Sequence, residues 1–105
     1  MNNNEIFNEL VKAQQEKYRI EEVLIDAIET WFADHDIQVT ARILDYNYIR
    51  IWSTDEKMCN FDMNDFCKEF NVEIDCYRHG WQWMRDSFSD EVPVSLYWMF
   101  ELHQV

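Results

Sequence analysis

The stretch VSLYWMFEL at residues 94–102 is the clearest strand in this chain and the best guide to its fold. Its large apolar side chains recur at every second position, and a strand points alternate residues toward the same face of a sheet. The apolar positions are Val94, Leu96, Trp98, Phe100 and Leu102, and they alternate with Ser95, Tyr97, Met99 and Glu101. The pattern predicts a half-buried strand with Trp98 in the core.

Shorter stretches upstream predict the partners of this strand. Residues 37–43 alternate apolar and polar side chains, residues 45–47 favour a turn, and residues 48–53 supply a β-branched and aromatic return strand. Residues 72–76 alternate again, with Val72, Ile74 and Cys76 on one face and the carboxylates on the other. We therefore expect an antiparallel sheet.

The segment 79–89 fits two patterns. Its aromatic residues match either a helix face or strand alternation, and the single glycine of the chain, Gly80, favours the strand. A three-residue loop at 78–80 would place Gly80 where a left-handed residue is needed. We predict a hairpin loop there, a strand after it, and a second turn at 89–91 before Pro93.

Two helices are expected beside the sheet. Residues 4–34 carry apolar side chains at three- and four-residue steps, Trp31 in the core among them, and end at Asp34-His35-Asp36. Such a helix is about 45 Å long, which is too long for a compact domain of this size. It must therefore break, overhang or form an oligomer interface, and the polar stretch 14–17 is where we expect the break or projection. After a polar loop at 54–60, Asn60 or Asp62 caps a short helix that ends near residue 70.

The expected fold is therefore α+β. A long N-terminal helix and one short helix pack on an antiparallel sheet of about four to five strands, and residues 1–105 form one domain.

The charge balance limits the function. The chain has 21 acidic and 9 basic residues, a formal net charge of −12, and 48% hydrophobic residues, which indicate a folded acidic surface. That charge repels phosphate and anionic membranes, so we expect neither direct nucleic-acid binding nor membrane binding. The start of the chain lacks a leader pattern and no apolar run is long enough to span a membrane, which predicts a cytoplasmic protein.

Catalytic and metal-binding motifs find little support. The three cysteines contain no CxxC pair, the three histidines lack ligand spacing, and one glycine excludes a glycine-rich phosphate loop. His79 and Cys76 lie three residues apart around a predicted hairpin, which is not a specific geometry for a nucleophile pair. We predict no catalytic residues, no metal and no cofactor, and hence no enzyme.

The acidic residues fall into ridges. By the 100° step of a helix, three carboxylates lie opposite the apolar stripe of the first helix, three more recur on the short helix, and two share a face of the next strand. Any one ridge can be explained as an ordinary solvated face. Like charges at such spacing, however, cost folding free energy, so the three ridges taken together favour a surface that binds a basic partner. Three aromatic residues are added as contact candidates. The partner-binding candidates are Glu22, Asp26, Glu29, Asp62, Asp65, Glu69, Glu73, Asp75, Tyr46, Tyr48 and Trp83.

In size, acidity and lack of a catalytic motif the chain resembles the small phage-encoded anti-CRISPR and DNA-mimic inhibitors. The resemblance implies that it binds the basic nucleic-acid surface of a Cas nuclease or similar defence protein in the host cytoplasm. Two alternatives stay open. One is an immunity protein or antitoxin that caps a nuclease toxin. The other is a structural or assembly component of a phage complex, with a homodimer through the first helix.

Overall fold

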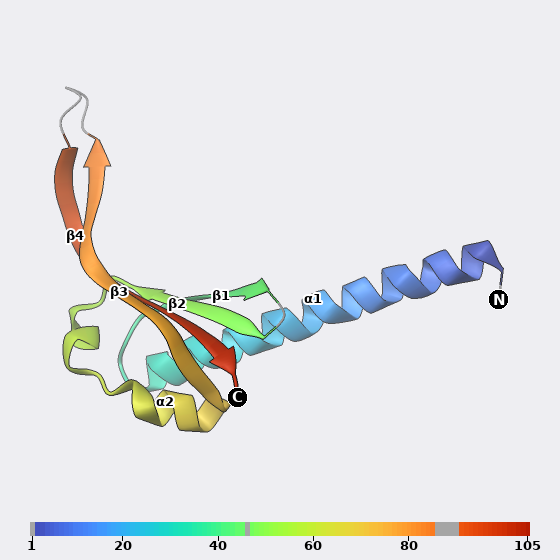
Figure 1. Ribbon diagram of the computed structural model, residues 1–105, viewed down its shortest axis with the longest axis horizontal. Helices are drawn as coiled ribbons and strands as arrows, with labels where there is room; N and C mark the ends of the chain where they lie inside the picture. Colours follow the sequence, from blue (N-terminus) through green and yellow to red (C-terminus); the bar gives the residue numbers. More distant parts are fainter. Residues whose placement is uncertain (1, 46, 86–90) are drawn as a thin grey trace.

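Two helices and a four-stranded antiparallel sheet make up the computed structural model, which describes residues 2–45, 47–85 and 91–105 (Figure 1). The elements in chain order are α1 (Asn3–Asp34), β1 (Thr40–Asp45), β2 (Tyr48–Ser53), the 3₁₀ helix η1 (Glu56–Asn60), α2 (Met63–Phe70), β3 (Val72–Arg85) and β4 (Glu91–Gln104). The strands lie in the order β1-β2-β4-β3. The expected α+β class is confirmed.

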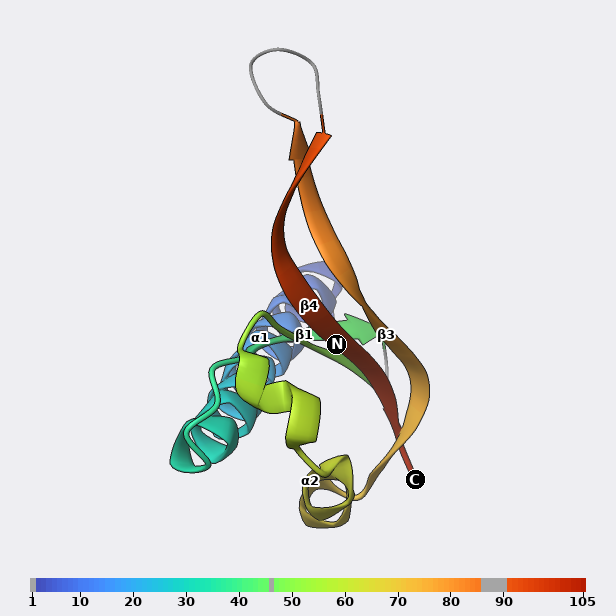
Figure 2. The same cartoon turned by 90° about the vertical axis from the view of Figure 1, so that its left-hand side faces the viewer.

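The core lies between one face of the sheet and both helices. Both α1 and α2 lie on the same side of the sheet (Figures 1 and 2). Trp98 is buried as predicted, whereas Trp31 is only partly buried at the border of the core, edge-on to Phe66. The largest fully buried apolar side chains are Phe32, Phe66, Ile28, Ile51 and Leu102.

Helix α1 is continuous and runs far beyond the sheet (Figure 1). Asn2 caps its N-terminus and forms a reciprocal capping box with Glu5. Of the alternatives for residues 14–17, a break is wrong: the helix continues through them and overhangs. The radius of gyration is accordingly 18.1 Å, against about 13 Å for a compact domain of this length.

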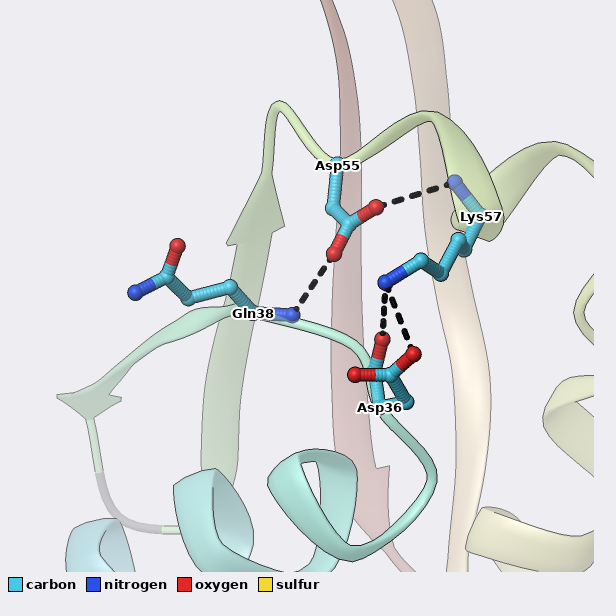
Figure 3. Close-up of polar contacts among 4 residues, drawn as sticks. All are labelled: Asp36, Gln38, Asp55 and Lys57. Atoms are coloured by element: carbon cyan, nitrogen blue, oxygen red, sulfur yellow. Dashed lines mark hydrogen bonds and ion pairs between the residues drawn. The ribbon is translucent and has the colours of Figure 1, made fainter.

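A polar latch joins the end of α1 to the segment after β2 (Figure 3). The Lys57 Nζ donates to the backbone oxygen of Asp36 at 2.8 Å and to its carboxylate at 3.0 Å. The Asp55 carboxylate accepts from the backbone N–H groups of Gln38 and Lys57, both at 3.0 Å. These two donors lower the pKa of Asp55. The latch closes around Asp36, whose φ of 61° makes the left-handed turn out of the helix.

The predicted polar loop at 54–60 is wrong for most of its length, because residues 56–60 form η1. Asp55 caps this turn and the Met58 side chain is buried beneath it. Because most residues of the segment are polar, the sequence pattern does not reveal this short helix. Asp62, the second of the two predicted caps, does begin α2.

The predicted hairpin loop at 78–80 is also wrong. Strand β3 runs without interruption from Val72 to Arg85, so the sheet has four strands, and Gly80 pairs with Tyr97 within it. Gly80 does not adopt a positive φ. The predicted strand at 79–89 is confirmed up to residue 85 as the second half of β3, and its remainder lies outside the described residues, as do Ser89 and Asp90 of the predicted turn.

A bulge at Asp75 resets the alternation in β3. Ile74 pairs with Leu102 and Cys76 with Glu101, so Asp75 is the extra residue. Cys76 thus shares the outer face with Glu73, and the prediction that it lies on the face of Val72 and Ile74 is wrong.

Strands β3 and β4 extend past β2 as a two-stranded arm. Strand β2 pairs with residues 98–103 of β4 only, so residues 80–85 and 91–97 pair with each other alone. We call these residues the β3–β4 arm; it projects from the body of the protein in both views (Figures 1 and 2).

Candidate interaction surfaces

Of the three carboxylates in the acidic ridge of α1, two are exposed and the third is bonded to the sheet. Glu22 and Asp26 are exposed, as the sequence predicted. The Glu29 carboxylate instead accepts a hydrogen bond of 3.2 Å from the backbone N–H of Ala41 in the edge strand β1. Glu29 therefore holds α1 to the sheet and contributes less to an outward-facing surface.

A second group of acids lies where α2 leads into β3. Asp62 caps α2 by accepting from the N–H of Asn64, and Asp65 and Glu69 are exposed on the helix. Burial raises the pKa of the Cys67 thiol, and the negative charges of Asp62 and Glu73 raise it further. Asp62, which caps α2, and Glu73 of β3 thus act on the same thiol, and we refer to the acids of these two successive ridges together as the acidic corner. Its members are Asp62, Asp65, Glu69, Glu73 and Asp75.

Several ridge carboxylates are not compensated by nearby positive charge. Glu73 lies 3.5 Å from His103. Among the described residues, five other ridge acids form neither an ion pair nor a side-chain hydrogen bond, namely Glu22, Asp26, Asp65, Glu69 and Asp75. The exposed like charges raise the energy of the isolated protein, and a basic surface would relieve that repulsion.

The charge is also unevenly distributed along the chain. Residues 1–20 hold three acidic and three basic residues, so their formal charge is zero. Residues 21–105 hold eighteen acidic and six basic residues and carry the entire −12. The projecting half of α1 is therefore neutral, and the net negative charge lies in residues 21–105.

Exposed aromatic side chains gather on the β3–β4 arm. Trp83, a predicted contact residue, is 55% exposed, and Trp81 is 52% exposed beside it. Tyr48 is partly exposed at the opposite end of the sheet, with its ring 5.8 Å from that of His103. Tyr46, also predicted, lies outside the described residues.

The sequence points to Trp81 as one of several aromatic residues but leaves it out of the final candidates, and sequence reasoning missed Met84 altogether. Both are more than half exposed on the arm. A single strand from residue 72 to residue 85 is much longer than β2, so its second half must project beyond the sheet. The predicted loop at Gly80 divided this strand in two and concealed the projection.

A groove of about 670 Å³ opens where α1 leaves the sheet. Ile20 and Leu24 line it from α1, and Phe70 and Val72 line it from α2 and β3. It is the second unusual surface of the molecule, and in contrast to the acidic corner it is mainly apolar. The remaining lining residues are Ala13, Glu16, Lys17, Glu21, Ile43, Asn47, Ile49 and Gln104.

The geometry does not assemble a nucleophile pair from Cys76 and His79. Cys76 pairs with Glu101 on the outer face, while His79 pairs with Trp98 on the other. The His79 ring stacks on Trp98, and its Nδ1 lies 2.9 Å from the backbone oxygen of Tyr97. Within the described ranges no three His, Cys, Asp or Glu side chains are grouped to hold a metal ion, and no helix there is long and apolar enough to cross a membrane.

Comparison with known proteins adds no relative: no family model, no curated protein and no solved structure matches this chain.

Proposed function

We propose that this protein is a small acidic inhibitor that binds the basic nucleic-acid-binding surface of a partner protein and blocks access of the substrate. The partner class is a Cas nuclease or a similar defence protein in the cytoplasm of the host cell. The inhibitor acts by occupying the surface and needs neither a catalytic residue nor a cofactor.

The observation that carries this proposal is the set of five exposed ridge carboxylates that have neither an ion pair nor a side-chain hydrogen bond among the described residues. Neighbouring carboxylates on a helix lie about 5–6 Å apart, a spacing that suits a groove of Lys and Arg side chains that binds phosphates. Opposite charge steers association, so the encounter is fast and sensitive to salt.

The aromatic residues of the arm supply the second part of the proposed contact. Trp and Tyr bury a large area with little loss of rotamer freedom and are enriched among residues that dominate binding energy. Trp81 and Trp83 project from the body on paired strands, so they can enter a recess in a partner. In this scheme the acidic corner governs association and the arm governs the lifetime of the complex.

An immunity protein or antitoxin that caps a nuclease toxin remains an alternative, since the same charges serve it equally well. The overhang of α1 favours a different alternative, an assembly component that forms an oligomer.

A competition assay tests the proposal. Purified Cas effector complexes and other basic nucleases are loaded with fluorescent DNA or RNA, and displacement by the protein is followed by anisotropy at low and high salt. We expect displacement from at least one partner, weakened at high salt. Failure to displace nucleic acid from any of them would overturn the proposal for these classes.

Two double variants with the same charge change locate the surface. Glu69→Lys with Asp75→Lys reverses two residues of the acidic corner, and Asp45→Lys with Glu56→Lys is the matched control at exposed sites elsewhere. We expect the corner variant to weaken displacement at least tenfold and the control less than threefold, with both variants melting cooperatively. Equal losses would show nonspecific attraction and contradict a defined site.

A further inference from the structure

The overhang of α1 repeats the apolar pattern by which the same helix packs on the sheet. Ile6, Phe7 and Leu10 lie eighteen residues before three residues that pack in or against the core, namely Leu24, Ile25 and Ile28. Eighteen residues are five turns of an α-helix. The two sets therefore face the same side of α1, but only the second set has the sheet beneath it.

The overhanging set is exposed to an extent unusual for a monomer. Ile6, Phe7 and Leu10 are each more than half exposed, and the apolar stripe leads directly into the groove lined by Ile20 and Leu24. Contiguous apolar surface of this kind marks an interaction site. Helical segments without tertiary contacts are also marginal in water, so a partner would stabilise the first turns.

We propose that the occupant is a second copy of this chain, in a symmetric dimer whose α1 helices cross antiparallel near Gln15. Ile6 and Leu24 each lie nine residues from Gln15, about 13.5 Å along the helix. Leu10 and Ile20 each lie five residues from it. An antiparallel crossing at this point places Ile6 and Leu10 of each copy on Leu24 and Ile20 of the other, and so in its open groove.

The charge distribution selects a second copy over a basic protein. The segment 1–20 has zero formal charge, so the overhang of each copy brings no net negative charge to the groove of the other. A basic partner is attracted to residues 21–105, which carry the −12. This interface thus leaves the acidic corner available and does not depend on the proposed inhibitory function.

The size and the polar centre of the overhang also fit a dimer. Residues 3–24 span about 33 Å, and half the side surface of a helix of that length and ~10 Å diameter is about 500 Å². Side chains of the sheet and α2 around the groove add to this, toward the ~800 Å² per partner of a stable interface.

Lys17 interrupts the apolar stripe near the crossing, and a polar residue in a helical seam specifies register at some cost in stability.

Sedimentation equilibrium of the full chain tests the dimer, with Leu10→Glu as the seam variant and Val23→Glu as its control. Val23 is similarly exposed but lies about 140° around the helix from Leu10. We expect the wild type and the Val23 variant to reach twice the monomer mass of 13.0 kDa at high concentration, and the Leu10 variant to dimerise at least tenfold more weakly. A monomeric wild type, or equal loss in both variants, would overturn the proposal.

Cross-linking tests the direction of the helices. An antiparallel crossing brings the two copies of Gln14 together and separates the two copies of Ile6 by about 27 Å. With a short bis-maleimide, Gln14→Cys should form covalent dimers above the background of the native cysteines, and Ile6→Cys should not. Efficient linkage of both would indicate a parallel seam and exclude the proposed arrangement.

Discussion

Leu10 and Ile28 lie on the same face of α1, five turns apart, but Leu10 is 55% exposed whereas Ile28 is fully buried. The helix presents the same kind of side chain to two different surroundings, the sheet at one end and solvent at the other. What distinguishes the two positions is therefore the presence of a packing partner and not the local sequence.

Substitution by alanine at these two positions should have very different effects on stability. Ile28→Ala is expected to lower the free energy of unfolding by about 2–5 kcal/mol, because it removes a buried side chain and leaves a cavity. Leu10→Ala, measured at concentrations where the chain is monomeric, should change it by less than about 0.5 kcal/mol. Urea denaturation followed by tryptophan fluorescence measures both. A large loss at Leu10 in the monomer would contradict the overhang.

Ser53 is a buried polar side chain whose loss should be costly. Its hydroxyl donates to the backbone oxygen of Gln38 at 2.6 Å and accepts from the backbone N–H of Asp55 at 3.0 Å. Ser53→Ala is expected to lower stability by about 1–3 kcal/mol, because both backbone groups lose their partner. The neighbouring exposed Thr54→Ala serves as control and should have little effect. Similar melting temperatures for the two variants would argue against these two hydrogen bonds of Ser53.

The stability contributed by Asp55 should depend on pH. Its pKa is lowered by the N–H groups of Gln38 and Lys57 from the unfolded value of 3.8, so folding favours the ionised carboxylate. The contribution is complete above the unfolded pKa and is lost as the pH falls through the lower folded pKa. Asp55→Asn should therefore destabilise the protein at pH 7 and converge with the wild type in strong acid. Chemical denaturation across this range measures the difference, and a gap that stays constant with pH would rule out the carboxylate as its source.

Gly80 should tolerate a side chain, in contrast to the loop residue that the sequence suggested. A Cβ at this position would lie 3.5 Å from the Tyr97 ring, an ordinary contact, and the backbone is not left-handed. Gly80→Ala is expected to be neutral or to stabilise the protein by up to about 1 kcal/mol, because it reduces the freedom of the unfolded chain. Thermal melting checks the sign. A clear destabilisation would favour the hairpin loop predicted from sequence.

The sequence predicted the elements better than it predicted their lengths. The period of α1, the cap at Asp62 and the alternation around Trp98 are local signals, and each is confirmed in the fold. The sequence predicts two strands separated by a loop at Gly80 because glycine is common in turns, whereas in the structure Gly80 lies within the single strand β3, next to the aromatic ring of Tyr97. The bulge at Asp75 was not foreseeable because a one-residue shift depends on pairing with β4.

The candidate surfaces divide in the same way. Most ridge carboxylates are exposed as their spacing predicted, because periodicity alone decides which side of an element faces the core. The sequence by itself thus determined the charge, the element types and the outward placement of the acids. Only the tertiary structure decided that Glu29 binds the edge strand, that Trp81 stands on a projecting arm and that half of α1 lies beyond the sheet. These outcomes depend on which segments meet across long separations in the chain, and such contacts leave no periodic trace in the sequence.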